Sequence, residues 1–166
     1  DNFRHQVYRV MYDNYQHIFQ VLTKRPMEMK KYMRKYVANS WTISGNILHP
    51  KNVWYGVSIE SADELWRAEV LKNTPANLRF ISFEPLLGPV PDLDLTGIDW
   101  VIVGGETGHN PRVMKEEWVL EILEACRKYK VPFFFKQWGG MIGNPMAKNR
   151  ELRGVVYNEF PVWSKI

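Results

Sequence analysis

The chain has 166 residues, 45% of them hydrophobic and 24% charged, so it is long enough to bury a core as one domain and is not of the disordered class. Its 22 Lys and Arg residues exceed its 18 Asp and Glu residues, and the net charge of +4 suits nucleic acid or anionic substrates without identifying either. One cysteine, Cys126, excludes an intrachain disulfide framework, and the lack of a membrane-length apolar run or signal-peptide pattern predicts a cytoplasmic protein with no membrane partner.

Helical periodicity and capping signals predict the elements between the apolar runs of the chain. Apolar residues recur at helical spacing in residues 1–14, and Pro26 is well placed as the first residue of a second helix. Ser61-Ala-Asp-Glu64 is a capping-box sequence, which predicts a helix that continues to about Lys72. The clearest amphipathic pattern predicts a further helix over about residues 115–130.

Five apolar runs each end at a charged residue, and each run predicts a strand. A continuous apolar run without polar alternation is typical of a strand buried on both faces of a parallel sheet. The runs cover residues 18–23, 53–59, 78–83, 99–105 and 131–135. The charged residues at their carboxyl ends are Lys24, Glu60, Glu84, Glu106 and Lys136.

Alternating strands and helices predict an α/β fold with parallel pairing. The strand-end charges are 36, 24, 22 and 30 residues apart, near the roughly 30 residues per unit of a (β/α) barrel that needs about 250 residues. Five βα-type units fall short of eight, and the chain does not begin with Met. We therefore predict the C-terminal portion of a TIM-type barrel, with an open doubly wound sheet as the alternative.

This fold class has consequences for the organisation of the chain. We expect a single domain over residues 1–166, in which residues 139–166 form an irregular tail with a short hairpin around Arg153-Gly154. Residues 38–52 are expected to form a long polar connection. A barrel that lacks strands would leave an open edge, which predicts a homo-oligomer formed through that edge.

The strand-end charges predict a site, because barrel enzymes collect residues from the carboxyl ends of several strands. Three crowded carboxylates, Glu60, Glu84 and Glu106, would raise one another's proton affinity unless something neutralises them. Three alternatives are therefore open: a bound metal ion, ion pairs with Lys24 and Lys136, or a proton held for acid/base work. A purely structural role, in which the charges seal the barrel top, is a fourth.

Five blocks of the sequence carry a resemblance to a known family. They are Phe19-Gln-Val-Leu-Thr-Lys-Arg-Pro26, Asn52-Val-Trp-Tyr-Gly-Val-Ser-Ile-Glu60, Arg79-Phe-Ile-Ser-Phe-Glu-Pro-Leu-Leu-Gly88, Asp99-Trp-Val-Ile-Val-Gly-Gly-Glu-Thr-Gly108 and Pro132-Phe-Phe-Phe-Lys-Gln-Trp-Gly139. In this order, from about Tyr15 to Pro161, they resemble the uncharacterised phage and prophage protein family gp thirty-seven / gp sixty-eight.

The resemblance implies a radical-SAM-like TIM barrel, because members of that family look like proteins with an N-terminal three-cysteine motif for a [4Fe–4S] cluster. That motif is absent from this chain, and Cys126 alone cannot hold a cluster. The resemblance therefore implies that the chain is the substrate and SAM side of a phage enzyme of unknown substrate, with nucleic acid as one candidate. S-adenosylmethionine and [4Fe–4S] are the implied cofactors of the full-length protein.

The resemblance also implies roles for individual residues. Ser58 and Glu60 follow a strand where radical-SAM enzymes place polar SAM contacts. Gly104, Gly105 and Glu106 look like the Gly-Gly-Glu of those enzymes, although there it follows an early strand and here it follows the fourth visible one. These five residues are the predicted cofactor contacts, and Gly104-Gly105 also suits either a phosphate or a tight turn. The predicted catalytic residues are Lys24, Glu84 and Lys136.

Two other function classes stay open. In a metal-assisted acid/base barrel enzyme, Glu60, Glu84 and Glu106 would hold Mg²⁺ or Mn²⁺, and Lys24 or Lys136 would be the base. In a non-catalytic nucleic-acid-binding protein, exposed Trp and Tyr side chains would act together with Lys and Arg.

Overall fold

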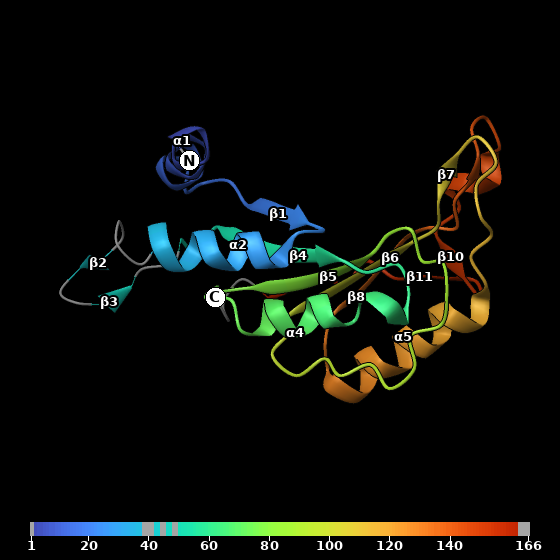
Figure 1. Cartoon of the computed structure of the whole chain (residues 1–166). Helices are drawn as coiled ribbons and strands as arrows, with labels where there is room; N and C mark the ends of the chain where they lie inside the picture. Colours follow the sequence, from blue (N-terminus) through green and yellow to red (C-terminus); the bar gives the residue numbers. More distant parts are fainter. Residues whose placement is uncertain (1, 38–41, 44–45, 48–49, 163–166) are drawn as a thin grey trace.

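A central sheet of five parallel strands organises the fold (Figure 1). The computed structural model describes residues 2–37, 42–43, 46–47 and 50–162. Each predicted run forms a strand, and these are β1 (Phe19–Thr23), β4 (Val53–Ser58), β5 (Arg79–Phe83), β6 (Trp100–Gly104) and β8 (Phe133–Gln137). They lie in this order across the sheet, and every neighbouring pair is parallel. The predicted α/β class is confirmed, while the sheet is open and the described residues do not close it into a barrel.

The helices begin where the sequence signals place them. They are α1 (Asn2–Asp13), α2 (Pro26–Tyr32), continued by a π-helical turn (Met33–Val37), α4 (Trp66–Lys72) and α5 (Glu116–Tyr129). Pro26 is the first residue of α2, as predicted. The predicted capping box is present, with the Ser61 hydroxyl accepting from the Asp63 N–H and the Glu64 carboxylate accepting from the Ser61 N–H. It begins a 3₁₀ turn (Ala62–Glu64) that precedes α4, rather than one continuous helix.

The helices α2, α4 and α5 all pack on one face of the sheet. Alternate residues of each strand, such as Tyr55 of β4 and Val103 of β6, form one buried cluster with apolar residues of these helices, such as Leu71 and Ile122. Residues 84–98, which connect β5 to β6 without a helix, bury Leu86, Leu93 and Leu95 in the same cluster. Among the described residues, no helix packs on the opposite face of the sheet, which we call the helix-free face.

The helix-free face carries a second, smaller buried cluster. Its members are Trp54, Leu78, Phe80, Trp100 and Ile102, with Phe134 packed against them. The end of the chain reaches this face, because the Phe160 ring centroid lies 4.8 Å from that of Trp100. The indole N–H of Trp100 also donates to the backbone carbonyl of Glu159 at 2.8 Å.

The region predicted as an irregular tail contains several short elements. The predicted hairpin around Arg153-Gly154 is confirmed as β10 (Glu151–Leu152) paired with β11 (Val155–Val156). The short strand β9 (Gly140–Met141) pairs with β7 (Thr107–Gly108), and a 3₁₀ turn (Pro145–Lys148) follows. Beyond the hairpin, Asn158 forms an antiparallel bridge with Phe134 of β8.

The predicted connection over residues 38–52 is described only in part. Its described portion includes the two-residue strands β2 (Thr42–Ile43) and β3 (Asn46–Ile47), which pair with each other. The rest of that connection up to residue 49 lies outside the described residues. Along the described part of the chain, none of the helices combines the length and apolar character needed to cross a membrane.

Candidate functional site

The five predicted charged residues lie at the same edge of the sheet, because all five strands run parallel. They separate into three ion-paired groups instead of one cluster. The groups are Lys24 and Arg67 with Glu60, Lys136 with Glu84, and Arg112 with Glu106. Two of these groups contain the lysine ion pairs that were one alternative from the sequence.

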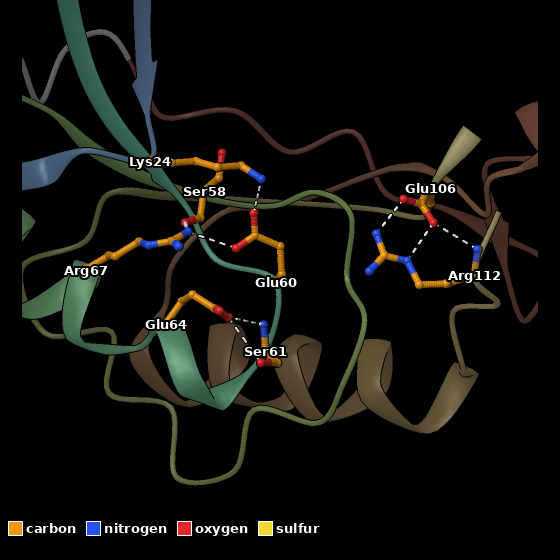
Figure 2. Close-up of polar contacts among 8 residues, drawn as sticks. All are labelled: Lys24, Ser58, Glu60, Ser61, Glu64, Arg67, Glu106 and Arg112. Carbon is orange, nitrogen blue, oxygen red and sulfur yellow. Dashed lines mark hydrogen bonds and ion pairs between the residues drawn. The ribbon is translucent and has the colours of Figure 1, made fainter. Parts of the chain in front are cut away.

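Glu60 is held between two bases that come from different elements (Figure 2). One carboxylate oxygen pairs with Lys24, just after β1, and the other lies 2.8 Å from Nη1 of Arg67 in α4. The same Arg67 nitrogen donates to the backbone carbonyl of Ser58 at 2.7 Å. Burial alone would raise the pKa of Glu60, but the two bases outweigh it and hold that pKa below its usual range. Glu60 is therefore an ionised carboxylate that ties α4 and β1 to the end of β4.

Glu84 and Lys136 form a second pair beside the helix-free face. The Lys136 ammonium donates to Oε2 of Glu84 at 3.1 Å. The other oxygen of Glu84, Oε1, is buried and has no hydrogen-bond partner among the described residues, and the same holds for the hydroxyl of Ser82. A buried polar atom without a partner is costly, so two such atoms on residues that line one pocket indicate a place where a ligand would contribute hydrogen bonds.

The glycine pair at the end of β6 has clear packing roles. A Cβ on Gly104 would lie 3.0 Å from Oε1 of Glu84, so the missing side chain leaves room for that carboxylate. A Cβ on Gly105 would lie 1.8 Å from the carbonyl oxygen of Trp138, and the Gly105 N–H already donates to the carbonyl of Gln137 at 3.0 Å. The close approach of two backbones thus accounts for Gly105, and cofactor binding by the pair stays a prediction.

Glu106 lies apart from Glu60 and binds Arg112 of the loop that follows β6 (Figure 2). It accepts from Nε of Arg112 at 2.9 Å, from Nη2 at 2.5 Å and from the Arg112 backbone N–H at 2.9 Å. These hydrogen bonds lower the pKa of Glu106 to about 2. Glu106 is partly buried and Arg112 is exposed, and the pair fixes the loop that follows β6.

The three glutamates do not gather around a common point. Each one binds a different base, and the described residues contain no group of three His, Cys, Asp or Glu side chains placed to hold a metal ion. The geometry of the site therefore does not favour the metal-assisted alternative, which stays a prediction.

The helix-free face is hollowed into a pocket of about 540 Å³, a size that suits a small molecule. One part of its wall is aromatic, formed by Phe80, Trp100, Phe134 and Phe160. The polar part of its wall is formed by Gln20, Ser82, Glu84, Lys136 and Arg150. Two of the predicted catalytic residues thus share one pocket, whereas Lys24 is bound to Glu60 outside that lining.

Several residues of these sites were not predicted from the sequence, and four of them illustrate why. Arg67 and Arg112 bind glutamates, while Arg150 and Phe160 belong to the pocket. Arg67 and Arg112 lie seven and six residues after their carboxylates, and such a spacing is too common on a surface to indicate an ion pair. Arg150 and Phe160 reach the pocket only through the path of the tail, for which the sequence has no local signal.

Comparison with known proteins places the chain in a family without assigning an activity. No curated protein and no solved structure matches it significantly. One family model does match, over residues 1–161. The chain therefore belongs to the uncharacterised family described as "Protein of unknown function (DUF5131)".

Proposed function

We propose that the chain is the C-terminal portion of a radical-SAM-like TIM barrel and forms the substrate side of that enzyme. One observation carries the proposal: the helix-free face has a pocket beside the carboxyl ends of strands, and two buried polar atoms of its lining residues have no hydrogen-bond partner within the described part of the chain. In (β/α) barrels the active site occupies this position.

The arrangement of the sheet supports a barrel portion over a doubly wound sheet. In a (β/α) barrel the parallel strands follow one another in chain order, the helices form the outer layer, and side chains fill the inner face. Doubly wound sheets instead carry helices on both faces. Here the strand order is β1-β4-β5-β6-β8, and α2, α4 and α5 share one face. The helix-free face then corresponds to the inside of the barrel.

Within this proposal the strand-end residues take different roles. Glu84 and Lys136 line the pocket and are the candidates for contact with substrate. Lys24 and Glu60 hold the ends of β1 and β4 together with Arg67, so they position the pocket wall without entering it. The resemblance to radical-SAM proteins supports the reaction class by analogy.

The two cofactors of the proposal do not fit this chain alone. Cys126 is buried in α5, and burial raises the pKa of its thiol to about 12, so it is unsuited to bind a cluster. Both oxygens of Glu60, a predicted SAM contact, are occupied by Lys24 and Arg67. The proposal therefore assigns the cluster ligands to the cysteine motif of the longer protein.

The decisive experiment is anaerobic iron–sulfur reconstitution of the full-length protein. We expect a visible spectrum typical of [4Fe–4S] and, with dithionite as electron donor, reductive cleavage of SAM to 5′-deoxyadenosine and methionine. Glu84→Gln, inside the pocket, should disturb the coupling of this cleavage to substrate. The matched variant Glu69→Gln, at an exposed carboxylate of α4 that pairs with Lys72 outside the pocket lining, should not.

A well-folded full-length protein that takes up no cluster and cleaves no SAM would contradict the proposal. A rise in melting temperature with Mg²⁺ or Mn²⁺ that is lost in Glu84→Ala would then favour the metal-assisted alternative. Salt-sensitive binding of nucleic acid that is unaffected by replacing the three glutamates would favour a non-catalytic binding protein.

A further inference from the structure

The pocket on the helix-free face combines three kinds of contact. Its aromatic wall includes Phe134 and Phe160, whose ring centroids lie 5.3 Å apart. Phe160 is half exposed, so its ring is available to a ligand. Aromatic side chains of this kind stack on flat ring systems, and every nucleobase offers such a flat face.

The polar atoms beside this wall are unsatisfied hydrogen-bonding groups. Ser82 is 1% exposed, its hydroxyl has no hydrogen-bond partner among the described residues, and the residue lines the pocket. Two residues further along the chain, the Oε1 atom of Glu84 is also buried and also has no hydrogen-bond partner among the described residues. A carboxylate oxygen accepts only, and a hydroxyl both donates and accepts. Together they match the edge of a nitrogen heterocycle, which presents N–H groups next to acceptors.

The charged groups in the pocket wall favour an anionic ligand. The charged residues of the pocket wall are Lys136, Arg150 and Glu84, so the wall carries one more positive than negative charge. Of the two basic residues, Lys136 pairs with Glu84. The Arg150 guanidinium lies over the Phe134 ring at 4.8 Å from its centroid and binds the side chain of Asn158. No carboxylate of the described residues pairs with Arg150. Guanidinium and ammonium groups are the usual partners of phosphate.

We infer that this pocket binds a nucleotide, with the base against the aromatic wall and the edge of the base at Ser82 and Glu84. The phosphate lies toward Lys136 and Arg150. The inference rests on the proposed function, since the nucleotide is the substrate of the proposed enzyme. The net positive charge of the wall favours an anionic nucleotide over SAM, because the sulfonium and ammonium groups of SAM make it a cation.

Isothermal titration of the chain with AMP, CMP, GMP and UMP tests the inference, with ribose 5-phosphate as the base-free control. We expect saturable binding of at least one nucleotide and about tenfold weaker binding of ribose 5-phosphate, because stacking and the edge contacts are lost. Equal affinity for nucleotides and ribose 5-phosphate, or no binding of any nucleotide, would overturn the inference.

Variants assign the contacts. Glu84→Gln should weaken nucleotide binding about tenfold, whereas Glu69→Gln, outside the pocket lining, should leave it unchanged. Lys136→Gln should weaken nucleotides and ribose 5-phosphate alike. If Glu84→Gln fails to fold, as judged by its circular dichroism, Ser82→Ala provides a second test, with an expected loss of about fivefold. Equal binding by the pocket variants and Glu69→Gln would place the nucleotide elsewhere.

Two further experiments distinguish a base within a nucleic-acid strand from a free nucleotide, and this inference from the proposed function. Single-stranded oligonucleotides that bind at least tenfold tighter than nucleotides, with the same Glu84 dependence, identify a base within a strand, and equal affinity identifies a free nucleotide. Displacement of the nucleotide by SAM would overturn the assignment to substrate. Nucleotide binding without SAM cleavage by the full-length protein would remove the proposed function alone, and cleavage without nucleotide binding would remove this inference alone.

Discussion

Gly56, in the middle of β4, is expected to tolerate no side chain. A Cβ at this position would lie 2.4 Å from two ring atoms of Phe80 and 2.6 Å from a third. Carbon atoms in contact are normally about 3.5–4.0 Å apart, so in Gly56→Ala the Phe80 ring would have to move by about 1 Å. Phe80 is fully buried and packs against Trp100, which limits that movement. The substitution is therefore an overpacking change at the floor of the pocket.

The magnitude follows from two opposing terms. Overpacking a core lowers the unfolding free energy by about 1–3 kcal/mol. Replacing Gly by Ala in a strand raises it by up to about 1 kcal/mol, because the unfolded chain loses conformational entropy. We expect Gly56→Ala to lose about 1–2 kcal/mol of unfolding free energy, which for a chain of this length lowers the melting temperature by roughly 3–6 °C.

Urea denaturation and thermal melting measure this loss against a matched variant. Gly108→Ala places a Cβ where no heavy atom lies within 4 Å, so its stability should change by less than about 0.5 kcal/mol. The double variant Gly56→Ala, Phe80→Leu should lose less than the sum of its single changes, because the smaller side chain makes room. Equal stability of the two Gly→Ala variants would refute the reasoning.

Two further predictions concern ionisable groups. Glu60→Gln should cost about 1.5–3 kcal/mol at pH 7, since it weakens a largely buried contact with Arg67. Because the folded-state pKa of Glu60 is lowered, this stabilisation is present above the unfolded pKa of about 4.3 and is lost as the pH falls through the folded value. The difference in urea stability between wild type and variant should therefore shrink below about pH 4, and a constant difference down to pH 3 would contradict the ion pair. Cys126 is buried with its thiol pKa raised to about 12, so at pH 8 a thiol reagent should label it only after unfolding; prompt labelling of the native protein would disprove this burial.

Most of the fold was predictable from the sequence because its signals are local. The apolar run ending at Phe135 is a strand, and the Ser61 capping signal begins a helical turn, as expected. Whether the sheet is open or closes into a barrel could not be predicted in this way, because it depends on how the edge strands are paired. No local pattern predicts that Asn158 pairs with β8, since the two segments are separated by a hairpin and two turns.

The candidate site was predictable only in outline. Parallel strands fix the edge at which Glu60, Glu84 and Glu106 lie, and this follows from the apolar runs alone. The partner of each carboxylate depends on side chains from helices and loops, so the expected crowding of three carboxylates became three separate ion pairs. The burial of Ser82 without a hydrogen-bond partner among the described residues depends on the packed structure and has no local sequence signal.

The two borders of the sheet differ in kind. Along β8, the N–H of Phe135 donates to Tyr157 at 3.0 Å and the N–H of Glu159 donates to Phe133 at 3.2 Å, so the chain's own end occupies that border. Along β1 the described residues supply no second neighbour. Edge-to-edge stacking of β1 on β8, which would propagate into a filament, is thereby blocked. The border that the described residues leave open to another strand is therefore that of β1, whether the strand belongs to the rest of the proposed barrel or to a second copy.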